Sequence, residues 1–423
     1  MDENLSTGGL KERLDDRNWR LAQHRKEYTR RYYQELSQAR EKGIPLAHTT
    51  AFGPTELLYS MGVMVCMPEN YITICAAKQM AQRFVEETES RGYSRDLCSY
   101  PRCGMGMVYL EDGPYGKLPE PDICIGTPMG CDPHAKWFEI EANYYGVPYF
   151  NMDGPYNFWG RVEEHEVEWM VYELKRLISF VEEHTKARFD YDRFKEAMIL
   201  SGKALELFDE VLALRKNIPT PRGIREALGD IFYIVTQLGR KEAVEYYSML
   251  LEDVKDRVNN KISIVPEEKY RIFYHNIPLW YNLQTLDYLA DHGAVVPIEF
   301  YNSFVWNGYY FDGNRFDPDD PFRSLALKLL YTDNDMGLHT KVERIVRCVK
   351  EWHCDGAIFF SNRSCKVFSI GQTDESERIG ELFGIPTMSF EAEMADPRSF
   401  AEGPWKNRVD AFLEVLEDKK RKN

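Results

Sequence analysis

The chain has 423 residues, of which 43% are hydrophobic and 29% are charged, and its formal net charge is −15. This length exceeds one compact core, so we expect two or three domains of an ordinary globular protein. The acidic balance argues against sequence-independent binding to nucleic acid, although a local basic pocket could still hold an anionic ligand.

The first 44 residues are charged throughout and predict an exposed N-terminal helix that ends near Gly43 and Pro45. No targeting segment and no run of 18 apolar residues is visible, so we expect no membrane span and a cytoplasmic location. In that compartment the nine cysteines are expected to be free thiols. Most free cysteines are small buried hydrophobic residues, which is the alternative that each candidate below must overcome.

Residues 45–160 are predicted to form a first α/β domain, because apolar spacing alternates between strand and helix periods. Its elements, in chain order, are a helix at 53–62, an extended stretch at 63–70, a helix at 70–91, a strand at 121–127, a helix opening at Asp132 and Pro133, and a strand at 147–152. Residues 161–264 are almost wholly amphipathic helix and predict a helical packing layer.

Residues 265–423 return to the alternation of strands and helices and predict a second α/β domain. Strands are expected at 269–278, 294–301, 355–362 and 385–390, and helices at 281–293, 342–353, 375–384 and 407–420. The fold class is therefore α/β, with two Rossmann-like parallel-sheet domains and a helical segment between them.

A weak internal repeat links the two α/β domains. Asp122 precedes an apolar strand and Cys131 follows it, and Asp355 and Cys365 flank a later strand in the same way. Both cysteines therefore lie just beyond the carboxyl end of a parallel strand, which is the sheet edge where open α/β sheets bind ligands. Two cysteines in matching positions favour a functional site over chance.

The stretch GYSRDLCSYPRCGMG adds Cys98 and Cys103. A plant-type ferredoxin would need a third cysteine at 106, where this chain has Gly106, and zinc sites favour C-x2-C pairs, of which there are none. A site assembled from Cys98, Cys131 and Cys365 remains. Three thiolates on a [4Fe–4S] cluster would leave one iron open to act as a Lewis acid or to pass an electron.

Three segments resemble the cluster-cysteine motifs of the family that contains the 2-hydroxyacyl-CoA dehydratases and the ATP-dependent benzoyl-CoA reductases. They are GYSRDLCSYPR, GCDPHAKWFE and DGAIFFSNRSCKVFSIGQ, and the segments MPEN, EEKYRI and ADPRSF are also similar and occur in the same order. The resemblance covers roughly residues 25–415. It implies that Cys98, Cys131 and Cys365 bind a [4Fe–4S] cluster at the crevice between the two sheet domains.

The other cysteines are expected to be structural residues rather than cluster ligands. Cys103 is expected to be a neighbour of the cluster, and Cys354 is a weaker candidate ligand because it lies only eleven residues before Cys365. The remaining four lie within apolar strand or helix patterns and are expected in the core: Cys66, Cys75, Cys124 and Cys348. Relatives with a double cubane cluster have a larger cysteine set that is not matched here.

The resemblance implies the iron–sulfur subunit of an ATP-dependent aromatic acyl-CoA (benzoyl-CoA) reductase, most like the longer of the cluster-bearing subunits of that enzyme. Such a subunit accepts low-potential electrons and reduces the thioester-activated ring. The alternative is an (R)-2-hydroxyacyl-CoA dehydratase subunit that works through a ketyl radical. The chain has no G-x4-G-K-[ST] loop and no G-x-G-x-x-G after a strand. The implied partners are ATP-hydrolysing activator subunits with their own [4Fe–4S] cluster, a homologous second cluster-bearing subunit, ferredoxin as indirect electron donor, and a CoA-thioester substrate.

Glu69 in MPEN is the expected catalytic residue by the same resemblance. A carboxylate in a desolvated site can have a raised pKa and move protons, and the alternative is a capping or surface residue. Glu56, His48 and Thr50 are weaker candidates from the same region. Ala51 falls where a dehydratase-type site has a serine, which weakens the dehydratase branch.

Two further groups of residues are candidates for contact with the substrate. Cations near the motifs could meet CoA phosphates, although each is more ordinary as a surface charge: Arg91, Arg95, Arg102 and Lys136. Aromatic residues could line a pocket for a planar acyl group, although such runs are usually core: Trp280, Tyr281, Trp306, Tyr309 and Tyr310. Two non-catalytic hypotheses also stand, namely an electron-relay or scaffold subunit and a protein whose cysteines are merely buried.

Overall fold

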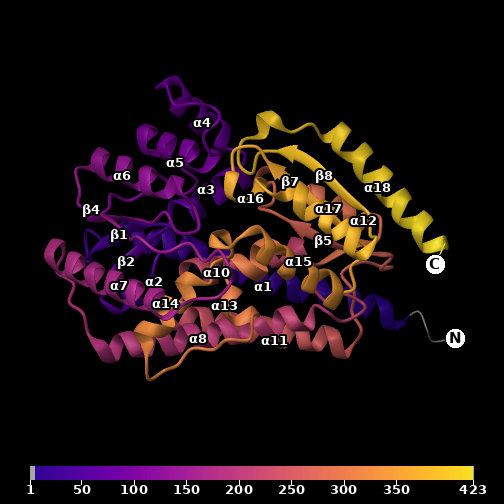
Figure 1. Cartoon of the computed structure of the whole chain (residues 1–423), viewed down its shortest axis with the longest axis horizontal. Coiled ribbons are helices and arrows are strands. Elements are labelled where there is room, and N and C mark those ends of the chain that lie inside the picture. Colours follow the sequence, from indigo (N-terminus) through magenta and orange to yellow (C-terminus); the bar gives the residue numbers. More distant parts are fainter. Residues whose placement is uncertain (1–4, 423) are drawn as a thin grey trace.

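The computed structural model describes residues 5–422, with side chains from residue 20 onward. Two four-stranded parallel sheets lie at the centre of the two halves of the molecule, and helices flank both (Figure 1). This arrangement confirms the predicted α/β class with two parallel sheets.

The first sheet has the strand order β2-β1-β3-β4, with every neighbouring pair parallel. Its strands are β1 (Leu46–Thr49), β2 (Met64–Cys66), β3 (Ile123–Gly126) and β4 (Tyr149–Asn151). The sequence prediction missed β1. This strand is short and contains His48 and Thr49, whose polar side chains are fully buried and hide the apolar signal of a central strand.

The helices of the first half are α2 (Thr55–Ser60), α3 (Pro68–Ala77), α4 (Ala81–Ser90), α5 (Ser99–Leu110) and α6 (Pro133–Tyr145). The single helix predicted over 70–91 is wrong, because the chain turns between α3 and α4, where Gln79 has a φ of +61°. Pro68 starts α3, so the end of the stretch predicted as extended belongs to a helix. Asp132 precedes α6 as predicted, but its side chain accepts no capping hydrogen bond.

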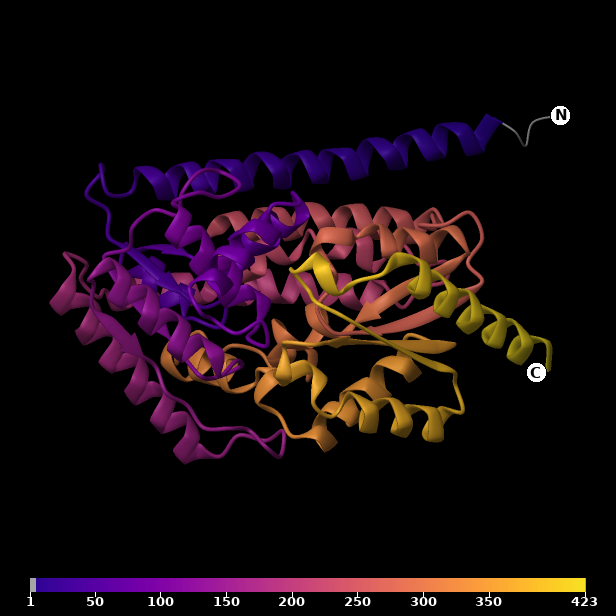
Figure 2. The same cartoon turned by 90° about the horizontal axis from the view of Figure 1, so that it is seen from above.

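The predicted helical layer is present as α7 (Glu164–His184), α8 (Tyr191–Leu214), α9 (Ile224–Ala227), α10 (Ile231–Thr236) and α11 (Lys241–Asn259). Helices α8 and α11 lie side by side along one face of the molecule (Figure 1). Helix α1 (Leu5–Gln38) runs along another side as a long rod, as Figure 2 shows from above. Among the described residues no helix combines the length and the apolar character needed to cross a membrane.

The second sheet repeats the first in its strand order, β6-β5-β7-β8, again with parallel neighbours. Its strands are β5 (Tyr270–His275), β6 (Ala294–Glu299), β7 (Gly356–Asn362) and β8 (Thr387–Ala392). The longer helices of this part of the chain are α12 (Gln284–Asp291), α14 (Pro321–Leu330), α15 (Leu338–Glu351), α17 (Gln372–Phe383) and α18 (Glu402–Lys422). Of these, α14 packs against α7 and α8. Short helical turns complete this half: η1 (Trp280–Asn282), η2 (Tyr301–Val305), α13 (Gly308–Phe311), η3 (Asp333–Asp335), α16 (Lys366–Ser369) and η4 (Pro397–Ser399).

The internal repeat seen in the sequence is confirmed at the level of hydrogen bonds. The backbone N–H of Leu46 donates to Asp122 Oδ2 at 2.8 Å, and the N–H of Asp122 donates back to the Leu46 carbonyl at 2.8 Å. Asp355 makes the same pair of bonds with Arg271, at 2.8 and 2.7 Å. In each half an aspartate therefore fixes the start of the third strand against the first.

Candidate active site

Three cysteines from distant parts of the chain line one pocket. Cys98 is the residue before α5, Cys131 lies in the loop between β3 and α6, and Cys365 is the residue before α16. They line a hollow that takes its walls from both halves, which we call the cysteine pocket. The structure thus brings the three predicted cysteines together, and their role as cluster ligands stays a prediction.

The strand order explains why these residues meet. In a sheet of this order the chain leaves the first and third strands toward opposite sides, which opens a crevice at their carboxyl ends. In the first half, Ala51 follows β1 and Cys131 follows β3, and both line the cysteine pocket. In the second half, Ile277 follows β5 and Cys365 follows β7, and both line the same pocket.

The pocket environment keeps its cysteines protonated when they have no cationic partner. Burial raises the pKa of the Cys98 and Cys131 thiols well above the ordinary value, and the nearby cysteines raise it further. Burial also raises the pKa of Cys365 to about 11. Three neutral thiols therefore face the pocket unless an electrophile binds them as thiolates, and the iron of an iron–sulfur cluster is such an electrophile.

The donor set fits a cluster better than a single ion. Within residues 20–422 no group of three or more His, Cys, Asp or Glu side chains is placed to hold one metal ion. In a [4Fe–4S] cluster each cysteine binds a different iron, so the thiols need not converge on one point. Three buried polar atoms on the pocket wall also have no hydrogen-bond partner among the described residues: His134 Nδ1, Trp306 Nε1 and Asn334 Oδ1. Such atoms are costly to bury, and a bound group would offset that cost.

A carboxylate and a histidine form a pair on the same wall. Glu69 Oε1 lies 2.8 Å from Nε2 of His134, and both Glu69 oxygens accept a hydrogen bond from the backbone N–H of Ala51 at 3.1 Å. The first turn of α3 positions Glu69, and the first turn of α6 positions His134. Both side chains are buried. A pair of this kind can pass a proton to or from a bound molecule.

Two tyrosines add hydrogen-bond donors to the pocket. Burial raises the pKa of Tyr100 and of Tyr301 above the ordinary value, so both phenols stay neutral. The Tyr100 hydroxyl accepts a hydrogen bond from Trp280 Nε1 at 2.6 Å and keeps its own proton for another acceptor. The pocket therefore offers neutral donors to an oxygen atom of a ligand.

The loops that hold the cysteines are tied together across the two halves. The backbone N–H of Ser99 donates to Ser364 Oγ at 3.1 Å. Asp335 Oδ1 accepts a hydrogen bond from the N–H of Gly130 at 2.8 Å, and Asn334 Nδ2 donates to the Gly130 carbonyl at 2.7 Å. Ser99, Ser364 and Gly130 each adjoin a pocket cysteine, so these bonds fix the relative positions of the three thiols.

The other six cysteines are buried and do not line the pocket: Cys66, Cys75, Cys103, Cys124, Cys348 and Cys354. The sulfur of Cys103 lies 4.0 Å from that of Cys75, so it packs between helices of the first half. Cys354 precedes β7, whereas Cys365 follows it, so the two lie at opposite ends of that strand. This separation removes Cys354 from the cluster candidates.

Two of the weaker acid–base candidates lie outside the pocket as well. His48 is bonded to Glu141 and, through Nε2, to the carbonyl of Pro119 at 2.8 Å within the first half. Glu56 lies 2.5 Å from Lys328 Nζ and accepts a hydrogen bond from Ser201 Oγ at 2.7 Å. Both carboxylate pairs are part of the packing around the site.

A second hollow, which we call the access channel, joins the cysteine pocket to the surface beside α1. The two hollows share five lining residues: Ala51, Glu69, Tyr100, Tyr301 and Trp306. The outer part of the channel is formed by α1, α3 and the segment from α9 to α10. A long ligand that enters beside α1 would therefore reach the Glu69 carboxylate.

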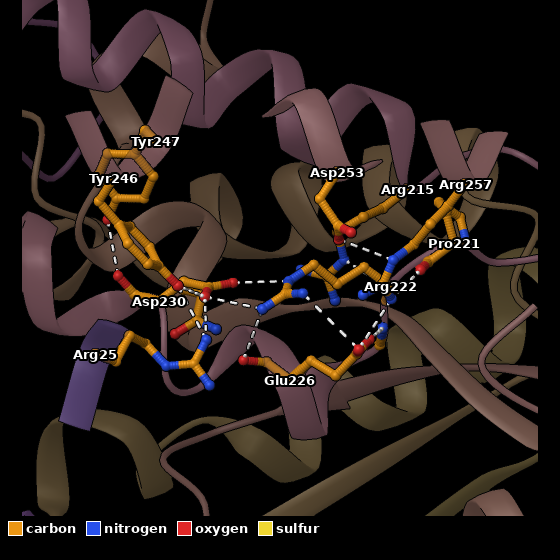
Figure 3. Close-up of polar contacts among 12 residues, drawn as sticks. Arg25, Arg215, Pro221, Arg222, Glu226, Asp230, Tyr246, Tyr247, Asp253 and Arg257 are labelled. Atoms are coloured by element: carbon orange, nitrogen blue, oxygen red, sulfur yellow. Dashed lines mark hydrogen bonds and ion pairs between the residues drawn. The ribbon is translucent and has the colours of Figure 1, made fainter. Parts of the chain in front are cut away.

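The mouth of the access channel carries three cations with different partners. Lys26 is exposed and has no ion-pair partner among the described residues. Arg225 is bound to Asp287 at 3.1 Å on the surface. Arg25 turns inward to Asp230 at 3.0 Å, as Figure 3 shows, so its charge is already balanced. Lys26 is thus the cation most available to an anionic ligand.

The four cations that the sequence suggested for CoA phosphates do not line the access channel. Lys136 and Arg91 pair with glutamates of their own helical segments. Arg102 is buried, pairs with Glu89 at 2.6 Å and donates to the Leu97 carbonyl at 2.8 Å. Arg102 therefore supports the loop before Cys98. Arg95 lies 3.9 Å from the same glutamate.

Three residues of the site were missed at the sequence level. His134 stands three residues after Cys131 in the same motif, so its position was a usable signal. Asn334 lies in a TDND segment that looks like turn chemistry, and Lys26 is one of many charges in the first helix. Nothing local in the sequence distinguishes these two from surface residues.

Comparison with known proteins agrees with this geometry. A family model described as "2-hydroxyglutaryl-CoA dehydratase, D-component" matches residues 50–416. A benzoyl-CoA reductase subunit of Thauera aromatica is 30% identical over 405 residues, which cover 92% of each chain. The (R)-2-hydroxyisocaproyl-CoA dehydratase alpha subunit of Clostridioides difficile is 29% identical over 401 residues, 92% of this chain and 95% of the relative. The (R)-phenyllactyl-CoA dehydratase alpha subunit of Clostridium sporogenes is 26% identical over 385 residues, 90% and 92% of the two chains.

Proposed function

Because the chain belongs to the 2-hydroxyglutaryl-CoA dehydratase D-component family, whose similar members here are subunits of enzymes, we propose that it is the iron–sulfur subunit of an ATP-dependent aromatic acyl-CoA reductase. One observation carries the proposal. Three cysteines from both halves, two of them buried, line a pocket that also holds the Glu69–His134 pair and opens to the surface through a channel.

Cys98, Cys131 and Cys365 would hold a [4Fe–4S] cluster. When bound, such a cluster supplies single electrons at low potential, and three protein ligands leave one iron without a cysteine. The hydrogen bonds to Ser364 and to Gly130 hold the cysteine loops in place before the cluster binds. Preorganised ligand loops favour one cluster geometry over others.

The access channel suits a CoA thioester. Lys26 at its mouth meets a phosphate, and the channel gives an extended arm a path to the cysteine pocket. There the neutral hydroxyls of Tyr100 and Tyr301 donate hydrogen bonds to the thioester carbonyl oxygen. Such donors stabilise negative charge that develops on this oxygen when the substrate accepts an electron.

Glu69 and His134 move the proton that accompanies the electron. The Ala51 N–H holds the Glu69 carboxylate in place, and His134 Nε2 lies within hydrogen-bond distance of it. His134 Nδ1 has no partner among the described residues, so it is free to bond a substrate atom or a water. The pair thus delivers a proton inside the cysteine pocket.

Ala51 favours the reductase over the dehydratase. It lines both the cysteine pocket and the access channel, at the position where the dehydratase resemblance implies a serine. A methyl group there offers no hydroxyl to handle a substrate 2-hydroxyl. The dehydratase remains the second candidate, because four similar relatives are dehydratase alpha subunits.

The partners follow from the same proposal. The similar relatives are named as subunits, which supports a homologous second cluster-bearing subunit. The chain has no phosphate-binding loop of its own. ATP-hydrolysing activator subunits with their own [4Fe–4S] cluster, charged by ferredoxin, would therefore deliver the electrons.

A strictly anaerobic turnover assay tests the proposal. The chain is purified with its second subunit and activator, and benzoyl-CoA and a 2-hydroxyacyl-CoA are offered separately while ATP hydrolysed per product is counted. Reduction of benzoyl-CoA with ATP consumed in every cycle is the expected result. Dehydration of the hydroxyacyl thioester with only catalytic ATP would move the chain to the dehydratase branch, and colourless protein without iron would overturn both.

A further inference from the structure

A third hollow meets the cysteine pocket and the access channel at Ala51 and Trp306, which line all three. The rings of Phe52 and Trp306 stack at its junction with the cysteine pocket, with centroids 5.0 Å apart. If the access channel holds the CoA arm and the cysteine pocket holds the carbonyl, this hollow is the space left for the acyl group.

The walls of this third hollow, which we call the acyl hollow, are mostly apolar. Aliphatic side chains supply much of its surface: Leu205, Ile234, Val235, Leu238, Val305 and Leu329. The aromatic side chains of Tyr309, Tyr310 and Tyr331 add flat surfaces. Apolar surface of this kind binds hydrocarbon groups by removing both surfaces from water.

The acyl hollow has no unbalanced charge among its described lining residues. Lys328 is the one charged side chain on the wall, and its Nζ lies 2.5 Å from the buried Glu56 carboxylate. Burial alone would raise the pKa of Glu56, but Lys328 more than offsets this effect and the pKa is lowered. The two residues therefore form a neutral ion pair, and a carboxylate on an acyl chain would find no free cation here.

Two lining residues of the acyl hollow carry unsatisfied hydrogen-bonding groups. Neither side-chain atom of Asn307 has a partner among the described residues, and neither has the hydroxyl of Thr332. Both side chains are more than nine-tenths buried. The two segments touch, because a Cβ added at Gly308 would lie 2.7 Å from the carbonyl oxygen of Tyr331. A neutral polar group placed here would satisfy both side chains.

Resting on the proposed function, we infer that the acyl hollow selects the acyl group of the substrate. It accepts a branched or aromatic hydrocarbon body with a neutral polar substituent, and it rejects a terminal carboxylate. The relatives named for isocaproyl, phenyllactyl and benzoyl thioesters carry acyl groups of the accepted kind, whereas the relative named for 2-hydroxyglutaryl-CoA does not.

Direct binding of CoA thioesters to the anaerobically purified complex tests this inference without turnover. The ligands are acetyl-, hexanoyl-, 6-hydroxyhexanoyl-, phenylacetyl- and glutaryl-CoA, and calorimetry gives each Kd. Hexanoyl- and phenylacetyl-CoA are expected to bind at least about tenfold more tightly than acetyl-CoA, because each buried methylene contributes about fourfold. Glutaryl-CoA is expected to bind about 30-fold more weakly than hexanoyl-CoA, because its carboxylate would be buried without a partner.

Two variants assign these preferences to named residues. Glu56→Gln keeps the hydrogen bond with Ser201 but frees the charge of Lys328, so glutaryl-CoA should gain about tenfold in affinity while hexanoyl-CoA stays within about twofold. Asn307→Leu should weaken 6-hydroxyhexanoyl-CoA about fivefold and leave hexanoyl-CoA unchanged. Glu210→Gln is the matched control. It removes an exposed carboxylate of α8 that pairs with Lys255, and it should change the affinity for neither glutaryl-CoA nor hexanoyl-CoA.

The outcomes separate this inference from the proposed function. If no CoA thioester binds, the proposed function fails. If all the thioesters bind with one affinity, or if glutaryl-CoA equals hexanoyl-CoA in the unaltered protein, the acyl hollow is not the acyl site although the function stands. If Glu56→Gln is folded, as judged by its retained hexanoyl-CoA affinity, and gains nothing for glutaryl-CoA, the assignment of Lys328 is overturned.

Discussion

The two halves of the molecule share a strand order and an aspartate that joins the first and third strands of each sheet, yet they differ in the residue that follows the first of these strands. Asp122 binds Leu46 and Asp355 binds Arg271. Counted from these two bound residues, Ala51 after β1 corresponds to Asn276 after β5. Ala51 leaves space at its crevice, where the hollows of the site meet. The side chain of Asn276 crosses its crevice and donates to the carbonyl of Phe360 at 2.7 Å.

The second crevice is sealed further by a buried histidine. His275 Nδ1 lies 2.8 Å from Gln372 Nε2, and the ring lies against Phe300 and Phe359 with centroids 4.3 and 5.4 Å away. A topology that opens a crevice therefore makes a ligand site only where the residues after the strands are small. The second half keeps a cysteine at the shared pocket and uses the rest of its crevice for stability.

The largest expected effect tests whether both halves supply cluster ligands. Cys131→Ala and Cys365→Ala should each reduce bound iron from about four atoms per chain to under about one, because a [4Fe–4S] cluster loses stability with a missing thiolate. Cys354→Ala, at the other end of β7, should keep its iron. The measurement is iron and sulfide analysis of anaerobic protein. If Cys365→Ala keeps a full cluster, the second half is not part of the site.

The buried histidines His134 and His275 give the next contrast. His134→Gln and Glu69→Gln should lower kcat by about 10²–10⁴, the range for loss of a general acid or base, with iron content unchanged. His275→Gln should leave kcat within about twofold and lower the melting temperature instead, because its partners are all structural. A loss of kcat in the His275 variant equal to that in His134→Gln would contradict the distinction between an open and a sealed crevice.

The comparison is tested directly by giving position 51 the asparagine that the second half has at the equivalent position. Ala51→Asn should fill the junction of the three hollows and raise the Kd for CoA thioesters at least about tenfold, because the added amide occupies ligand space. The melting temperature should stay close to that of the unaltered protein, because the added amide enters the space of the hollows rather than packed core. Ala51→Ser is the small control, and its Kd should stay within about threefold.

Much of this fold was predictable from the sequence, and much of the site was not. Cys131 and Cys365 were found because they follow recognisable apolar strands, and Cys98 because of a motif. The strand β1 was missed because His48 and Thr49 are buried polar residues, whose partners lie far along the chain. Local periodicity cannot carry that information.

The same reason explains why the cation at the channel mouth was not found from the sequence. Cations were sought near the cysteine motifs, but α1 brings Lys26 to the channel mouth from a distance of more than forty residues in sequence from Glu69. Asn334 reaches the Cys131 loop from about two hundred residues away. Contacts of this kind depend on how the two halves dock, which a single sequence does not express through spacing.

The sealed crevice should also make stability depend on pH. Burial raises the pKa of Glu375 to about 8, and Lys341 only partly opposes this, while Asp333 and Asp374 add to it. His275 faces Glu375 as well, and burial lowers its pKa. The folded protein thus holds the Glu375 proton more tightly than the unfolded chain does. The stabilisation from the protonated Glu375 carboxyl is fully present below about pH 4.5 and is lost as the pH rises through about 8.

The measurement is the melting temperature from pH 6 to pH 9. It should fall over this range by roughly 2–4 °C for each kcal/mol lost, and Glu375→Gln should flatten the fall because the amide does not ionise. Glu381→Gln, on the exposed side of α17, should keep the slope. A slope unchanged in Glu375→Gln would assign the pH dependence to another group.

The smallest expected effect tests the repeat itself. Asp122→Ala and Asp355→Ala each remove one acceptor for a backbone N–H at the start of a first strand, so each should cost about 0.5–1.5 kcal/mol of unfolding free energy. Asp355 also lies 3.2 Å from Lys420, but that pair is half exposed and should add less than about 1 kcal/mol. Lys420→Ala measures this addition separately by chemical denaturation. Near-equal losses after that subtraction mean that the two aspartates contribute the same unfolding free energy in both halves. A loss confined to one half would mean that the two halves share these hydrogen bonds but not their contribution to stability.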